Sequence, residues 1–143
     1  MIYKILTINI AVVLLLSCKS DGYLTKPTGV FYQSTSFDNM DRDYILYVPS
    51  TYDENSSLPL VFNLHGGAMT ARDQMEQVSD MRSLADSENF ILVYPQSTSE
   101  NGIPIWNLGG ENSKATDVDD VGYISHLINK ISNFYSINLD RVY

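Results

Sequence analysis

The sequence predicts an α/β protein. Residues 60–64 and 90–94 are short apolar runs that lack the alternation of a half-exposed strand, as expected for strands covered on both faces. Between these two runs, apolar residues recur at three- and four-residue spacing, which indicates a helix. A buried strand, a helix and a second buried strand in this order form the repeating unit of α/β sheets.

Two further strands are predicted before these, at residues 30–37 and 44–48, where aromatic and β-branched residues are frequent. The residues between them, 38–41, have turn chemistry, so we expect a hairpin at the edge of a sheet. Pro49 ends the second of these strands, and residues 53–57 form a solvated loop.

Two helices are predicted, the first over about residues 71–88 and the second after residue 120. Residues 141–143 would then begin another strand. The buried stripe of the first helix comprises Met75, Val78, Met81, Leu84 and Ala85. The apolar face of the second helix comprises Val121, Ile124, Leu127, Ile128, Ile131 and Phe134. His126 lies beside this face, so we expect it to be solvent-facing or partly packed.

Three carboxylates, Asp117, Asp119 and Asp120, crowd the start of the second helix. They can cap free N–H groups and interact with the positive end of the helix dipole. The EF-hand template for calcium fails, because Val121 and Ile128 stand where oxygen ligands belong. Without a His/Cys cluster a zinc or haem site is not expected either, and the sequence predicts no metal and no cofactor.

The most informative segment is the break from the strand at residues 60–64 into His65-Gly66-Gly67. Glycines after a strand let the main chain approach a ligand, and backbone N–H groups there can stabilise an oxyanion. We expect Gly67 and Ala68 to be the donors; the alternative is a plain tight turn. His65 is expected to shape the loop, since no partner nucleophile for a catalytic base is identifiable.

Several segments around this loop occur in a characteristic order: residues 42–49, 59–61 leading into 65–67, 90–96, 106–107, 119–124 and 140–143. Together they resemble the secreted esterase family that includes polyhydroxybutyrate depolymerases and feruloyl and acetylxylan esterases. The resemblance covers roughly residues 37–143. It implies an α/β-hydrolase fold in which residues 65–68 (His65, Gly66, Gly67, Ala68) form the oxyanion loop.

The family's nucleophile motif, Gly-x-Ser-x-Gly, does not occur in the 143 residues. The resemblance implies that the serine, acid and histidine of the triad would follow Tyr143, so the fold is expected to be truncated before the nucleophile elbow. The 143-residue chain is therefore expected to be inactive. If the absent strand lies beside residues 60–64, an apolar strand edge would be open, and the chain would be unstable or aggregate.

Three residues are candidates to line a substrate cleft. Gln96 follows a strand end on the expected catalytic side, and Ser97, Thr98 and Ser99 after it are most simply a polar loop. Trp106 and Asn107 belong to a loop with too many helix and strand breakers for a regular element. Trp106 either stacks on sugars or aryl groups or plugs the loop onto the core, and the sequence leaves both open.

The N-terminus predicts export. Residues 1–17 resemble a secretory signal peptide, and Leu15-Leu16-Ser17-Cys18 resembles a bacterial lipobox in which Cys18 is lipidated. Residues 18–29 would tether a domain at residues 30–143 to the envelope, on the periplasmic side or at the surface. The alternatives are an ordinary signal peptide or a short membrane anchor.

The acidic composition argues against two classes of partner. A net charge of −8 and a pI near 4.4 disfavour binding to nucleic acid and to anionic membrane surfaces. The resemblance implies an exported serine ester hydrolase acting on polyhydroxyalkanoate or plant cell-wall esters. The alternatives are a serine peptidase on the same scaffold and a non-catalytic lipoprotein or pseudogene product derived from the family.

Overall fold

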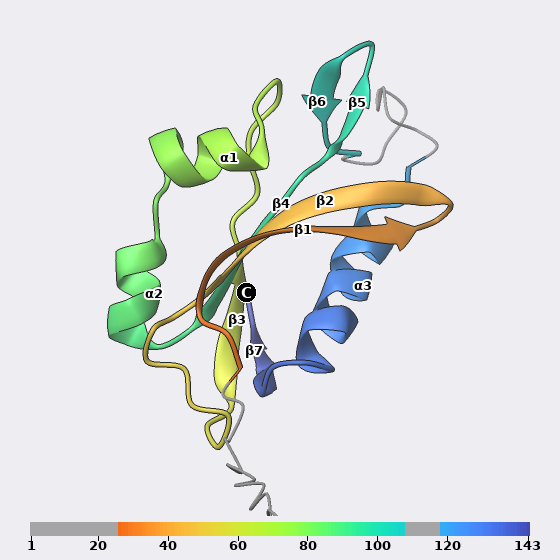
Figure 1. The fold of residues 1–143 in the computed structure, drawn as a ribbon. Helices are drawn as coiled ribbons and strands as arrows, with labels where there is room; N and C mark the ends of the chain where they lie inside the picture. The colour runs from red at the N-terminus through yellow and green to blue at the C-terminus, as the bar shows by residue number, and fades with distance from the viewer. Residues whose placement is uncertain (1–25, 108–117) are drawn as a thin grey trace, which may run out of the picture.

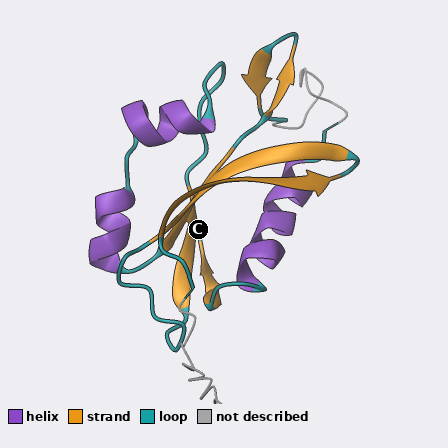
Figure 2. Cartoon of the chain, viewed as in Figure 1, coloured by secondary structure: helices purple, strands orange, loops and turns teal. Residues whose placement is uncertain are grey.

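A five-stranded sheet with helices on both faces organises the protein (Figures 1 and 2), and a computed structural model describes residues 26–107 and 118–143. The strand order is β1-β2-β4-β3-β7, in which β4, β3 and β7 are parallel and β1 and β2 antiparallel. The predicted α/β fold is therefore confirmed. The elements are β1 (Gly29–Phe37), β2 (Met40–Val48), β3 (Leu58–Phe62), α1 (Ala71–Asp73), the π-helical turn η1 (Gln74–Val78), α2 (Arg82–Glu88), β4 (Ile91–Pro95), β5 (Thr98–Glu100), β6 (Ile103–Ile105), α3 (Asp120–Ser132) and β7 (Ile137–Val142).

The β1–β2 hairpin is longer and its turn tighter than the sequence predicts. Asp38 and Asn39 form the whole turn, with φ angles of 51° and 59°. Left-handed conformations at both central residues characterise the type I′ turn, whose twist matches that of the flanking strands. Pairing consequently starts at Phe37 and Met40 and continues to Gly29 and Val48.

The single helix predicted over residues 71–88 is wrong, because three short segments replace it. Tyr94 of β4 explains the break between η1 and α2: its hydroxyl donates to the Ser79 carbonyl (2.9 Å) and accepts from the Met81 N–H (3.0 Å). These bonds satisfy backbone groups that a continuous helix would have paired internally. Val78 and Leu84 are consequently exposed, whereas Met75 and Ala85 of the predicted stripe are buried.

Residues 98–105, predicted as irregular loop, form the two-stranded β5–β6 hairpin instead. Its turn uses Asn101 and Gly102, both with positive φ. The breakers that suggested a loop are turn residues here, and the hairpin projects beyond the ends of β2 and β4 in Figure 1.

Helix α3 begins as predicted, with Asp119 as its cap: the carboxylate accepts a hydrogen bond from the Gly122 N–H (2.7 Å). Leu127 and Ile131 are buried on its inner face, but Val121 and Phe134, also assigned to that face, are exposed. These two residues are the first and the last of the predicted face, and Phe134 follows the last residue of α3. Asp117 lies outside the described residues.

Strand β7 covers part of the edge of β3 that the sequence analysis expected to be open. The Tyr143 N–H donates to the Leu60 carbonyl (2.9 Å), and the Phe62 N–H donates to the Tyr143 carbonyl (2.8 Å). β7 begins at Ile137, before the predicted residues 141–143. The prediction of an open β3 edge is therefore wrong, and the edge strands of the described sheet are β1 and β7.

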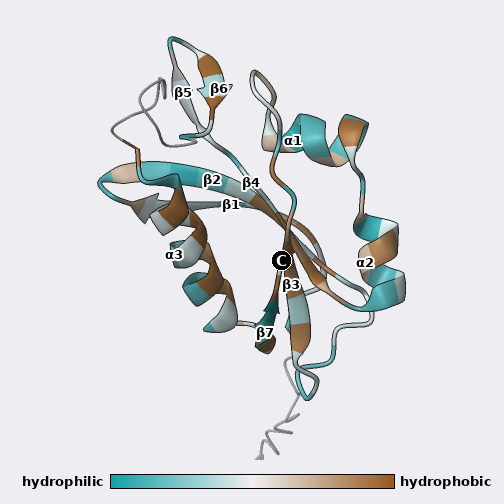
Figure 3. Cartoon of the chain, turned by 180° about the vertical axis from the view of Figure 1, so that it is seen from behind, coloured by the Kyte–Doolittle hydropathy of each residue, from teal (hydrophilic) through white to brown (hydrophobic). Residues whose placement is uncertain are grey.

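Two apolar cores lie on opposite faces of the sheet (Figure 3). One packs α3 against the sheet and includes Tyr123, Leu127 and Leu60. The other packs α1, η1 and α2 against it and includes Met75 and Tyr94. Within residues 26–107 and 118–143, no helix has the length and apolar character needed to cross a bilayer.

Candidate functional site

The His-Gly-Gly loop follows the C-terminal end of β3, where the main chain leaves the sheet. The His65 side chain is 3% exposed, and both of its ring nitrogens have partners. Nε2 must accept, because its partner at 3.1 Å is the Ser97 backbone N–H. In the neutral ring the proton therefore sits on Nδ1, which donates to the Gly66 carbonyl (2.7 Å).

This arrangement gives His65 a structural task in the loop. Its two nitrogens bind Gly66 in the loop after β3 and Ser97 in the segment after β4, so the loop is braced against the neighbouring strand end. A general base needs a nitrogen within reach of the proton that it removes. Both ring nitrogens of His65 are engaged within the protein, and its role in shaping the loop stays a prediction.

The backbone N–H groups of the His-Gly-Gly loop differ in whether they already donate a hydrogen bond within the protein. The Ala68 N–H donates to the Pro104 carbonyl of β6 (2.9 Å), so it is already engaged inside the protein. Among the described residues, none accepts a hydrogen bond from the Gly66 or Gly67 N–H, and both glycines are exposed. Of the two donors that the sequence suggested, Gly67 is therefore the available one.

Ala68, and neither glycine, adopts the left-handed conformation in this loop, with φ of 61°. A side chain in this region costs about 1–2 kcal/mol, so the turn is held by its surroundings. The bond from Ala68 to Pro104 is one such restraint, and it connects the loop to the β5–β6 hairpin.

Gln96 links the loop to the first helical segment. Its Oε1 accepts from the Ala71 N–H (2.8 Å), and its Nε2 lies 3.2 Å from His65 Nε2 and donates to the Ser97 carbonyl (3.3 Å). Its side-chain amide is consequently engaged within the protein. Gln96 also lines a groove, and its contact with a substrate stays a prediction.

Trp106 and Asn107, the other cleft candidates, are bound to the protein itself. The Trp106 Nε1–H donates to the His65 carbonyl (3.0 Å), and its ring centroid lies 5.1 Å from that of His65. This contact favours the interpretation in which Trp106 holds its loop against the core over the one in which its ring is exposed to stack on a ligand. The Asn107 N–H donates to Asp120 Oδ2 (2.7 Å), and its side chain donates to the Val118 carbonyl (2.7 Å).

A buried ion pair beside these residues escaped the sequence analysis, which assigned Asp120 to helix capping. Arg42 of β2 donates from Nη2 to Asp120 Oδ1 at 2.6 Å, and the two side chains are 2% and 7% exposed. The guanidinium also lies 3.9 Å from the ring centroid of Tyr123. A signal was present: alternation along β2 places Arg42 on the same face as Tyr44 and Leu46, which face the α3 core.

Two further features that the sequence singled out, His126 and the possibility of a metal site, add nothing to the candidate site. His126 is half-buried, with its Nε2 2.9 Å from the Thr35 hydroxyl and its ring against Phe37. Within the part of the chain that the structure describes, no three His, Cys, Asp or Glu side chains form a group that could hold a metal ion. Cys18 lies outside the described residues.

Known proteins resemble this chain in both sequence and fold, although no protein-family model matches it. A bifunctional acetylxylan esterase/xylanase of Neocallimastix patriciarum is 32% identical over 102 residues, which cover 71% of this chain and 13% of that enzyme. A ferulic acid esterase of family CE1 from Anaeromyces mucronatus, solved with ferulic acid, aligns with a TM-score of 0.54 and 25% identity over 85% of this chain and 51% of that one.

A third likeness concerns the fold alone. An S-formylglutathione hydrolase from Agrobacterium tumefaciens aligns with a TM-score of 0.59 and 18% identity over 79% of this chain and 46% of its own. The chain thus spans about half the length of the solved structures and a small part of the curated relative. With the sheet order and the His-Gly-Gly loop, these likenesses establish that the chain belongs to the esterase-like family of α/β-hydrolases.

Proposed function

We propose that this protein is an exported carboxylic ester hydrolase that works through a serine acyl-enzyme and uses the Gly67 N–H as an oxyanion donor. The observation that carries the proposal is the solvent-exposed Gly67 amide in a loop braced by His65, Trp106 and Gln96. A rigid donor that needs no rearrangement is what stabilisation of a tetrahedral intermediate requires.

The resemblance supplies the rest of the reaction. A serine after β7 would attack the ester carbonyl, and the loop would hold the resulting oxyanion. Collapse of this intermediate would break the ester C–O bond and release the alcohol, and water would then cleave the acyl-serine bond to release the acid and the free serine. Gly-x-Ser-x-Gly is absent from the 143 residues, so the serine, acid and base would have to lie outside this sequence.

Plant cell-wall esters are the proposed substrates, and the activities of two relatives support this choice. The curated relative is an acetylxylan esterase, and one solved relative is a ferulic acid esterase. A polyhydroxyalkanoate remains the second ester class implied by the sequence resemblance.

The test is to express the natural gene product and measure hydrolysis of p-nitrophenyl acetate, methyl ferulate, a polyhydroxybutyrate film and a peptide substrate. Ester hydrolysis with labelling by a fluorophosphonate is the expected result. Cleavage of the peptide alone would favour the serine peptidase alternative, and neither hydrolysis nor labelling would leave a non-catalytic protein.

Two variants then test the oxyanion role of Gly67. A Cβ at Gly67 would meet nothing within 4 Å, so Gly67→Ala keeps the N–H and is expected to retain activity. Gly67→Pro removes the N–H, and kcat should fall by roughly 10²–10³-fold. Circular dichroism must show that both variants fold; equal activity of the two folded variants would refute the assignment.

We also propose that Cys18 carries a lipid that anchors the protein to the cell envelope. Palmitate labelling of cells that express the natural gene should give a labelled product, and Cys18→Ser should abolish the label and release the protein from the membrane fraction. An unlabelled product cleaved near residue 17 would indicate an ordinary signal peptide.

A further inference from the structure

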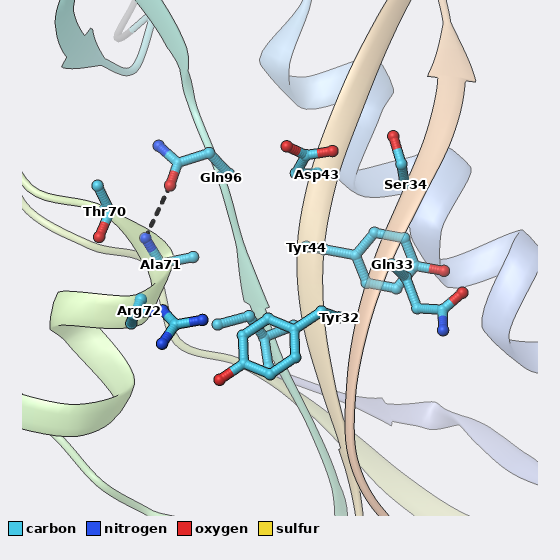
Figure 4. A pocket seen from close by; sticks show the side chains of 10 residues that line it. Tyr32, Gln33, Ser34, Asp43, Tyr44, Thr70, Ala71, Arg72 and Gln96 are labelled. Carbon is cyan, nitrogen blue, oxygen red and sulfur yellow. Dashed lines mark hydrogen bonds between the residues drawn. The ribbon is translucent and has the colours of Figure 1, made fainter.

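A groove of about 570 Å³ lies between the β1–β2 hairpin and the start of α1 (Figure 4). One wall consists of Tyr32 and Ser34 of β1 with Asp43 of β2, and Ser34 and Asp43 are cross-strand partners. The opposite wall is the segment from Thr70 to Arg72. The proposed reaction does not use these residues.

Tyr32 is held in the groove by a cation instead of by the core. Its side chain is 53% exposed, and the Arg72 guanidinium lies 4.9 Å from its ring centroid. Figure 4 shows the two side chains meeting across the groove. An exposed aromatic ring that is already oriented loses little conformational freedom when it contacts a ligand.

The polar groups around the ring are available to a ligand. Among the described residues, none hydrogen-bonds to the Tyr32 hydroxyl, the Ser34 hydroxyl or the Asp43 carboxylate. All three residues are exposed. Together they offer one acceptor-only group and two hydroxyls that both donate and accept.

We propose that this groove binds a neutral sugar unit of a polysaccharide, next to the ester that the proposed enzyme would hydrolyse; the inference rests on that proposed function. A sugar presents a C–H face that packs on an aromatic ring and hydroxyls that donate to a carboxylate. Asp43 and Arg72 give the groove one charge of each sign, so the groove favours neither an anionic nor a cationic ligand.

The groove adjoins the candidate oxyanion loop through one shared residue. Gln96 lines the groove, while its side chain also contacts Ala71 and the His65 ring. A polysaccharide lying along the groove from Tyr32 to Gln96 would therefore reach the loop that is proposed to receive the ester carbonyl. The groove would contribute affinity for the polymer, and the loop would contribute the chemistry.

The test compares binding of xylohexaose, by calorimetry, to the natural gene product and to two variants of it with matched aromatic truncations. Tyr32→Ala removes the ring from the groove and is expected to weaken binding at least roughly fivefold. Phe134→Ala is the control, because Phe134 is also 53% exposed and also lies beside a cation, Lys26. Phe134 follows the C-terminal end of α3 and does not line the groove. Its affinity should equal that of the parent.

Asp43→Asn is the second variant in the groove, since it keeps the shape of the side chain. It should weaken binding by a smaller factor, because an amide oxygen is a poorer acceptor than a carboxylate. No binding of xylohexaose at millimolar concentration, or equal binding by parent and Tyr32→Ala, would overturn the proposal. Weaker binding by Phe134→Ala alone would overturn it as well.

The same preparations separate this inference from the proposed function. A protein that binds xylohexaose through Tyr32 but hydrolyses no ester supports the groove and contradicts the enzyme. A protein that hydrolyses p-nitrophenyl acetate but does not bind xylohexaose contradicts the groove and supports the enzyme.

Discussion

Arg42 and Asp120 show how single residues far apart in sequence determine the surroundings of the candidate site. Asp120 Oδ1 pairs with Arg42, and Asp120 Oδ2 accepts the Asn107 N–H, so one carboxylate joins β2, α3 and the segment after β6. Arg42 Nε and Nη1 are buried without a hydrogen-bond partner in the described part of the chain. The cation over the Tyr123 ring offsets part of this cost.

Breaking this pair should be strongly destabilising. Asp120→Asn leaves the Arg42 charge buried without its counterion, and we expect a loss of about 3–5 kcal/mol of unfolding free energy. Urea unfolding measures it. Asp119→Asn is the matched control, because asparagine caps a helix about as well as aspartate, and it should change stability by less than about 0.5 kcal/mol. Equal effects of the two variants would contradict the buried-pair argument.

The positive φ of Ala68 gives a second prediction at this scale. Ala68→Gly should leave stability unchanged or raise it by up to about 1 kcal/mol, because relief of the left-handed conformation offsets the greater freedom of the unfolded chain. Ala68→Val should lower it by about 1–3 kcal/mol. Thermal unfolding of both variants checks this, and a stable Ala68→Val protein would refute the strained geometry.

Among the elements, α2 depends on a carboxylate that ties it to the end of β2. Asp86 accepts hydrogen bonds from the Ser50 N–H (2.9 Å) and the Tyr47 hydroxyl (2.8 Å). These two bonds lower the pKa of Asp86, in that order of importance. Burial, followed by the hydrogen bond to Asp86, raises the pKa of Tyr47 to about 12.

This pKa shift predicts an acid-sensitive contribution from Asp86. A carboxyl whose folded pKa is lowered stabilises the fold above its unfolded pKa, about 3.9, and loses that contribution as the pH falls through the folded value. Asp86→Asn should therefore destabilise the protein at pH 6 and cost less at pH 2. The measurement is the difference in melting temperature between the parent and the variant, taken at each of the two pH values.

The control for this titration is Asp41→Asn, at an exposed carboxylate of the β1–β2 hairpin. Asp73 and Asp80, whose pKa values are also lowered by hydrogen bonds, titrate in parent and variants alike and cancel in the comparison. A difference for Asp86→Asn that is independent of pH would rule out the titration as its cause.

At the scale of the molecule, the two cores share the central strands, so both faces of the sheet depend on the same backbone ladder. Leu92 and Tyr94 of β4 face one core, and Ile91 and Val93 face the other. β7 and β1 are the two edge strands of this sheet among the described residues, and β7 carries Leu139, which is 63% exposed.

A chain of these 143 residues expressed alone is expected to self-associate through the β7 edge, since an unpaired strand with exposed apolar side chains can pair with another copy. Leu139→Lys should reduce association, because a charge at an edge opposes such pairing. Val121→Lys, at an exposed position on α3, should have no such effect. Light scattering against concentration measures both, and a monomeric parent chain would contradict the prediction.

The sequence alone determined the elements whose signals are local. The alternation and turn chemistry of the β1–β2 hairpin, the apolar runs of β3 and β4, and the Asp119 cap of α3 each occupy a few consecutive residues. Their physical cause is the repeat of the backbone itself, which is visible in any short window. The order of segments around His65 likewise sufficed to indicate the family, which the relatives confirm.

Only the tertiary structure decided the features that depend on partners distant in the chain. Tyr94 interrupts the helix expected over residues 71–88, Pro104 engages the Ala68 amide, and Asp120 pairs with Arg42 across 78 positions. In each case a polar group could bind water, a group of its own helix or strand, or a partner distant in the sequence. That choice follows from which groups the folded sheet brings within hydrogen-bond distance and out of contact with water.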